Sequence, residues 1–219
     1  STTVSGTGTQ TLTVTDSTLL GTSADVTLMA SVTVPTKAQK SKTANKMTKK
    51  TIAATLLNVF GERVSDNTIN LSYADVYTLH AVYESGAVAT VAVAPTLTIT
   101  NDTGTFTVGE VITGSSTGAT GRVISDTGNV ITYVALAGIF TTNDNITGGT
   151  SDYFANVSAV TTGDRVVTSH FLLDTGQRDS YYDLGKINRK AEAVVPVTGS
   201  AGALLVVYDY FVHQTSNDY

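Results

Sequence analysis

The feature that most constrains the fold is the alternation of apolar and polar side chains at period two. It is clearest in residues 26–34, where Val, Leu and Ala occupy the even positions and Thr, Ser and Met occupy the odd ones. This period is that of a β-strand with one buried face, and Pro35 ends the ladder because it has no backbone donor. The chain of 219 residues contains 40 threonines, whose β-branched side chains favour strands over helices. We therefore predict an all-β protein built from small antiparallel β-sandwich domains.

Further strand patterns follow along the chain. Residues 73–83 alternate in the same way, and a weaker strand is expected over Val88 to Ala94, closed by Pro95. Residues 204–213 are apolar on both faces. That pattern predicts a central strand covered on both sides.

An internal repeat occupies the Gly- and Thr-rich middle of the chain. Phe106 aligns with Phe140 at an offset of 34 residues, and Glu110 aligns with Asp144. The other matched pairs are Thr107 and Thr141, Ile112 and Ile146, Thr113 and Thr147, Gly114 and Gly148, and Val123 and Val157. Each copy predicts a hairpin with a Gly-permitted turn. Because a lone hairpin is marginal in water, we expect the two copies to pack on each other as a small barrel or sandwich.

These patterns divide the chain into three parts. Residues 1–60 form an N-terminal β region, and 61–95 with 165–219 form a discontinuous sandwich-like domain that receives 96–164 as an inserted hairpin-repeat domain. Within the first part, residues 37–50 hold six of the 13 basic residues. We expect this Lys-rich segment to be a solvated loop, or a protruding hairpin whose lysines discourage edge pairing. A docking surface for an acidic partner is the alternative.

Composition excludes several classes of function. The chain has no cysteine, which rules out disulfides, thiolate zinc sites and thiol nucleophiles. Its net charge of −5 argues against nucleic acid as a partner, because neutralising phosphates needs a basic excess. No apolar run approaches the ~20 residues that span a bilayer, so no membrane partner is expected.

Candidate catalytic groups are scarce. The three histidines are His80, His170 and His213, and their spacing matches no metal-ligand signature. His80 and His213 fall in strand patterns, so a hydrogen-bonded strand histidine is favoured over a catalytic base or a metal triad. No G-x-S-x-G motif is present. We predict that the chain is not an enzyme and has no catalytic, cofactor-binding or metal-binding residues.

The polar clusters favour structural roles. Asn143 to Asn145 is interpreted as a turn whose side chains bond their own backbone, with a weak calcium site as the alternative. The stretch from Asp174 to Asp183 is interpreted as a structural corner, in which Arg178 pairs with a carboxylate and two tyrosines cover the sheet end. Gly114 to Gly121 lacks the Lys and the helix of a phosphate loop and is expected to form turns.

Two segments carry a resemblance to a known family. Residues 173–187, LDTGQRDSYYDLGKI, and 204–213, LLVVYDYFVH, resemble virion structural proteins of tailed phages, especially tail and baseplate proteins of contractile-tailed cyanophages and other marine phages. Residues 73–83 and the inserted F-T-V-G-E element are similar to them as well. The resemblance implies that the matched residues are fold determinants. They are Arg178, Asp179, Tyr181, Tyr182, Asp183, Asp209, Tyr210 and Phe211.

The resemblance implies a structural role in a virion, in the tail, baseplate or a tail appendage, with no cofactor. The expected partners are other virion structural proteins and further copies in a symmetric homo-oligomer, and a host receptor is a further candidate. Because the family's chain continues past the motif, we expect this sequence to be part of a larger protein. The alternatives are a receptor- or carbohydrate-binding module at a tail tip and a bacterial surface adhesin or S-layer-type β domain.

Overall fold

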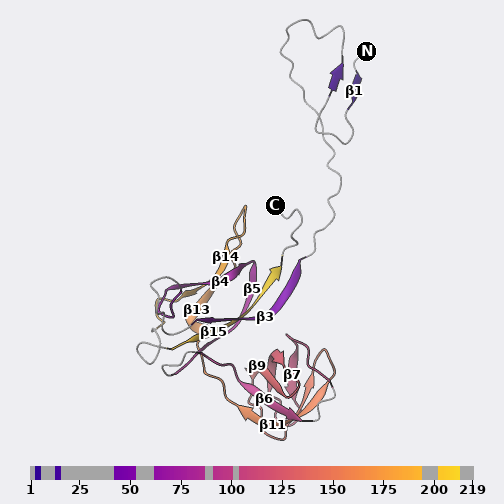
Figure 1. Ribbon diagram of the computed structural model, residues 1–219, viewed down its shortest axis with the longest axis vertical. Helices are drawn as coiled ribbons and strands as arrows, with labels where there is room; N and C mark the ends of the chain where they lie inside the picture. The colour runs from indigo at the N-terminus through magenta and orange to yellow at the C-terminus, as the bar shows by residue number, and fades with distance from the viewer. Residues whose placement is uncertain are drawn as a thin grey trace. The chain divides into compact units, whose positions relative to one another are not determined.

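The computed structural model divides into two compact units, Ser1–Lys40 and Ser41–Tyr219 (Figure 1). The residues that it describes are 3–5, 13–15, 42–52, 62–86, 91–100, 104–193 and 202–212. In the first unit, β1 (Thr3–Ser5) pairs antiparallel with β2 (Thr13–Thr15). The strand expected over residues 26–34 lies outside the described residues.

The second unit contains two antiparallel sheets that form a sandwich. The four-stranded sheet has the order β12-β5-β15-β3, and the three-stranded sheet has the order β13-β14-β4. The bounds of the first sheet are β12 (Arg165–Val166), β5 (Val76–Glu84), β15 (Leu204–Val212) and β3 (Thr43–Ile52). Those of the second are β13 (Phe171–Asp174), β14 (Leu184–Arg189) and β4 (Thr68–Ala74), and the short 3-10 helix η1 (Thr168–His170) precedes β13.

Strand β15 is the centre of this unit because both its faces are buried. Leu204, Val206 and Tyr208 belong to the core cluster between the two sheets. Leu205 and Val207 belong to a second cluster, which the outer face of the four-stranded sheet shares with barrel strands. The expectation of a central strand covered on both sides is therefore confirmed.

A closed six-stranded barrel is inserted between β5 and β12, with the order β10-β11-β6-β9-β8-β7 (Figure 1). Its strands are β6 (Thr96–Thr100), β7 (Val111–Gly114), β8 (Thr120–Asp126), β9 (Val130–Ala137), β10 (Asn145–Gly148) and β11 (Phe154–Thr161). Closure leaves no free sheet edge, so a charge-poor segment needs few lysines to prevent edge pairing. The barrel core consists of side chains such as Leu97, Ile112, Ile131 and Ile146.

The two sequence copies are related by a local twofold arrangement inside the barrel. Strands β7 and β10 pair antiparallel, with Thr113 opposite Thr147. Equivalent bonds recur in each copy: the Gly114 N–H donates to Ala119 O at 2.9 Å, and the Gly148 N–H donates to Tyr153 O at 2.8 Å. The prediction that two hairpin copies pack as a small barrel is confirmed.

The acidic residue of each copy binds the turn of the other copy. Glu110 accepts from the Thr150 and Ser151 N–H groups, both at 2.9 Å. Asp144 accepts from the Ser116 N–H at 2.9 Å and from the Thr117 hydroxyl at 2.5 Å. Both carboxylates are buried. A turn is present here, since the Asp144 N–H donates to Thr141 O at 3.2 Å, but the Asp144 side chain bonds the other copy and not its own backbone, which corrects the expectation for Asn143 to Asn145.

The Lys-rich segment corrects one expectation, because residues 43–52 are strand β3 and not a loop. This strand pairs with β15 along its length, and Met47 and Ile52 are buried. It is an edge strand of the sheet, a position in which lysines can project into solvent beside a ladder bonded on one side only. The 1–60 region is therefore not a separate domain, since β3 belongs to the second unit.

The expected strand over residues 73–83 is also wrong at its start. Asp75 has φ 53°, in the left-handed region, so β4 ends at Ala74 and β5 begins at Val76 in the other sheet. Asp tolerates this conformation better than β-branched residues do. Residues 91–94, the described part of the segment from Val88 to Ala94, carry no strand.

Candidate functional site

The sequence motif within residues 173–187 forms the connection between β13 and β14. Gln177 bridges to Tyr182, and the Arg178 N–H donates to Tyr181 O at 3.0 Å. Gly176 has φ 80°, and a Cβ there would lie 2.2 Å from the Asp183 carbonyl oxygen. The segment is therefore a tight hairpin that requires glycine at this position.

Arg178 holds the base of this hairpin. Its two terminal nitrogens donate to both carboxylate oxygens of Asp174, at 2.9 and 2.8 Å, and Nη2 lies 3.5 Å from Asp183. The Arg178 bonds and the Gly176 N–H lower the pKa of Asp174 to about 2. Lys186 donates to Asp183 at 2.8 Å and lowers the pKa of that carboxyl. The expected pairing of Arg178 with a carboxylate is confirmed.

A buried carboxylate, Asp75, joins this hairpin to the four-stranded sheet. Gln177 Nε2 donates to its Oδ1 at 2.5 Å, and Lys42 Nζ lies 2.5 Å from its Oδ2. Lys42 also donates to the Tyr182 hydroxyl at 3.0 Å and lies 4.8 Å from that ring's centroid. The hydrogen bond to Asp75, followed by that to Tyr182, raises the pKa of Lys42. The ammonium therefore stays charged. It links Asp75 to Tyr182 of the hairpin and is a poor nucleophile.

Sequence reasoning missed the contribution of Lys42, Asp75 and Gln177. One signal for Asp75 was present, because a charged residue interrupts a run of apolar and aromatic strand positions. The partners carry no local signal, since Lys42 and Gln177 lie 33 and 102 residues from Asp75.

The second motif places Asp209 at a bulge between β15 and β3. Its Oδ1 accepts from the Met47 N–H at 2.6 Å, and Met47 has φ 54°. Its Oδ2 accepts from the Tyr77 hydroxyl at 3.3 Å, and burial followed by the Asp209 charge raises the pKa of that phenol. His80 Nε2 lies 2.9 Å from the same oxygen, at an angle that does not make a hydrogen bond. Asp209 therefore satisfies a strained backbone amide.

The aromatic motif residues stack on rings of β4 and β5. Tyr210 lies 4.0 Å from the Tyr73 ring and accepts a 2.7 Å hydrogen bond from Asn45. Phe211 is half-buried and stacks on Tyr77 at 4.3 Å. The structure brings Tyr182 and Phe211 together around Lys42. It leaves Asp179 and Tyr181 exposed in the hairpin, so Tyr181 does not cover the sheet end.

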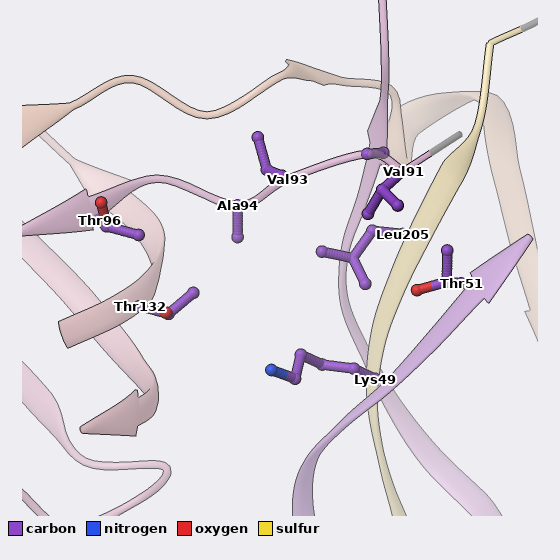
Figure 2. Close-up of a pocket in the computed structure, with 9 residues that line it drawn as sticks. Lys49, Thr51, Val91, Val93, Ala94, Thr96, Thr132 and Leu205 are labelled. Carbon is purple, nitrogen blue, oxygen red and sulfur yellow. The ribbon is translucent and has the colours of Figure 1, made fainter. Parts of the chain in front are cut away.

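Two cavities lie between the sandwich and the barrel. The first, of about 280 Å³, is lined by Lys49, Thr51, Leu205, residues 91–94, Thr96 and Thr132. Figure 2 shows Lys49 extending its amine toward the space between the sheet and the barrel threonines. The second, of about 270 Å³, is more apolar and includes Tyr83, Tyr133 and Ile139.

Within the residues that the structure describes, no group of three or more His, Asp or Glu side chains is placed to hold a metal ion. His80 lies in β5 and His170 ends η1, and His213 lies outside the described residues. Over the same ranges, no helix has the length and apolar character needed to cross a bilayer. Comparison with protein-family models, with curated proteins and with solved structures finds no match.

Proposed function

We propose that the chain is a non-enzymatic structural component of a tailed-phage virion, in its tail, baseplate or a tail appendage, and that it acts by protein–protein assembly. The observation that carries this proposal is the use of the buried carboxylates. Each of them bonds to a cation, an amide or a hydroxyl that belongs to the fold itself. They are Asp75, Glu84, Glu110, Asp144 and Asp209.

This pattern favours a building block over a catalyst. A catalytic carboxylate must remain available to substrate, whereas these groups are fully engaged in holding distant segments together. Residues of the two motifs also bond within the fold: Arg178 stabilises the β13–β14 hairpin, and Asp209 stabilises the bulge between β15 and β3. The resemblance of residues 173–187 and 204–213 to tail and baseplate proteins is the reason for proposing that this assembly is a phage virion.

Immunogold labelling of phage particles with an antibody against this chain tests the proposal directly. We expect label at a fixed position on the tail or baseplate of intact particles, repeated according to the particle's symmetry. Label that is absent from intact particles but present in the infected cell would contradict the proposal. Turnover of a glycan or peptide by the purified chain, abolished by one Asp or Glu substitution, would contradict it as well.

A receptor- or carbohydrate-binding module is the second candidate, and the exposure of Tyr181 favours it. Exposed aromatic rings can stack on sugar faces, and Arg178 and Asp183 lie in the same hairpin as Tyr181. A glycan array distinguishes the two functions. Binding that disappears in a Tyr181→Ala variant would support recognition, and a flat array would leave assembly as the function.

A further inference from the structure

The first cavity, of about 280 Å³, combines an apolar wall with a few polar groups. It lies where the four-stranded sheet meets the barrel, and small-molecule sites commonly occupy such junctions between folded parts. The side chains of Leu205, in β15, and of Ala94 point into its space (Figure 2). None of the described residues that line it is acidic. The lining therefore suits an apolar molecule and disfavours a cationic one.

Lys49, in β3, gives the cavity a single positive charge. Its amine extends toward the barrel (Figure 2), and it has no hydrogen bond or ion pair with any described residue. Lys50, the next residue of the strand, is by contrast paired with Glu62. A charge without a partner attracts an anionic group. One ammonium complements a monoanion such as a carboxylate, whereas a phosphate dianion is usually bound by several cations or backbone amides.

Three threonine hydroxyls line the same cavity. Thr96, in β6, and Thr132, in β9, are directly opposite each other in the barrel ladder, so their side chains project from one face of it. Thr51 lies across the cavity in β3, two residues from Lys49 and on the same face of that strand (Figure 2). No hydrogen bond of these three hydroxyls is found in the part of the chain that the structure describes. Each can donate to a carboxylate oxygen, and a carboxylate accepts several such bonds.

Backbone hydrogen bonds hold residues 91–94 at the edge of the cavity. The Asp164 N–H donates to Val93 O at 2.9 Å, and the Asp164 carboxylate accepts from the Val93 N–H at 2.7 Å. The Tyr133 N–H, in β9, donates to Pro95 O at 3.1 Å. Because the fold itself orders this segment, binding a ligand does not incur that cost.

We propose that this cavity binds a small monocarboxylate with an apolar body. The carboxylate pairs with Lys49 and accepts from the Thr96 and Thr132 hydroxyls, and the apolar body packs against Leu205 and Ala94. A cavity of about 150 Å³ accommodates benzene, so 280 Å³ is enough for a chain of about six carbons. The polar groups come from β3 and from the barrel, so the ligand also links the two. This inference goes beyond the proposed assembly function and does not depend on it.

Calorimetric titration of the purified chain with hexanoate tests the proposal, with hexan-1-ol and hexylamine as probes of the same length. We expect hexanoate to bind with a Kd of about 0.1–1 mM, the range expected for so small a ligand. Hexan-1-ol should bind at least about tenfold more weakly, because it cannot pair with the ammonium. Hexylamine should not bind, because Lys49 repels its charge.

Two substitutions identify the groups that hold the carboxylate. Lys49→Met keeps the length of the side chain and removes its charge, and it should weaken hexanoate binding at least about tenfold. Thr132→Val removes one hydroxyl, and it should weaken binding about three- to tenfold. Lys46→Met is the matched control, because Lys46 is an exposed lysine of the same strand outside the cavity lining, and its loss should leave binding unchanged. The urea unfolding midpoint of each variant checks that it is folded.

NMR locates the bound hexanoate, since the shifts should be largest at Thr96, Thr132 and Leu205. No binding of hexanoate up to about 10 mM would overturn the proposal. Equal binding of hexan-1-ol would overturn it as well, because the charge would then take no part. The same loss of affinity in Lys46→Met and Lys49→Met would do likewise, since it would reflect only the net charge. Hexanoate binding by a chain that antibodies do not find in phage particles would support this inference and contradict the proposed function.

Discussion

Replacing Glu110 with Gln should destabilise the barrel, because this one carboxylate holds the turn of the other repeat copy. It accepts four hydrogen bonds: from the N–H groups of Thr107, Thr150 and Ser151, and from the Ser151 hydroxyl. Gln keeps one acceptor oxygen but places an NH₂ group against at least one N–H donor. Losing the charge and one or two of these bonds should lower the free energy of unfolding by about 2–4 kcal/mol.

The pKa of Glu110 also predicts how the free energy of unfolding changes with pH. Burial alone would raise the pKa of the Glu110 carboxyl, but the bonds from Ser151, Thr150 and Thr107 outweigh it and lower the pKa below 4.5. A carboxyl whose pKa is lower in the folded state stabilises the fold above its unfolded pKa. This stabilisation is lost as the pH falls through the folded pKa. Wild-type stability should therefore drop as the pH falls below about 4.5, and the Glu110→Gln variant should lose this part of the drop.

Urea unfolding at neutral pH and at pH 3 measures both effects, and amide exchange at Thr150 and Ser151 reports the barrel specifically. Glu192→Gln is the matched control, because it neutralises an exposed carboxylate and should leave stability within about 0.5 kcal/mol of wild type. A Glu110→Gln variant that unfolds at the same urea concentration as Glu192→Gln would refute the reasoning.

Three further predictions follow from single contacts. Gly114→Ala should lower the free energy of unfolding by about 2–4 kcal/mol in urea titrations, because its Cβ would lie 2.2 Å from Asp144 Oδ2; a wild-type midpoint would exclude the carboxylate–turn contact. Phe211→Ala should cost about 1–3 kcal/mol in the same assay, less than for a fully buried ring, because the side chain is half-buried. Arg178→Ala should raise the pKa of Asp174 from about 2 toward 3.8 in an NMR titration. An unchanged Asp174 pKa would show that the two side chains are not paired in solution.

The sequence predicted most where the signal was local. Each repeat copy carries its own hairpin pattern, and the pairing of Glu110 with Asp144 in the alignment marked the positions that exchange bonds across the barrel. The strand over residues 204–213 was predictable for the same reason, since apolar side chains on both faces directly express burial on both faces. Closure into a six-stranded barrel required β6 and β9 in addition, which lie outside the two hairpin copies.

The wrong predictions concern segments whose local composition does not indicate their tertiary contacts. The Lys-rich segment has the composition of a loop, yet an edge strand beside β15 tolerates lysines because part of its surface faces solvent. The break at Asp75 depends on a left-handed backbone and on Lys42 and Gln177, which come from distant parts of the chain. No window of a few residues contains that information, so periodicity alone extended the strand through it.

The two ends of the inserted barrel are also joined by residues that are far apart in the sequence. Strand β5 ends at Glu84, the barrel follows, and the chain returns at Arg165, directly opposite Glu84 in the sheet register. The buried Glu84 carboxylate accepts from the Arg165 guanidinium at 2.5 Å, across 81 residues. A disordered insertion of this length would have to bring its ends together at an entropic cost. A closed barrel holds its own ends, so the ladder between β5 and β12 and the Glu84–Arg165 pair add stability to the sandwich with little of that cost.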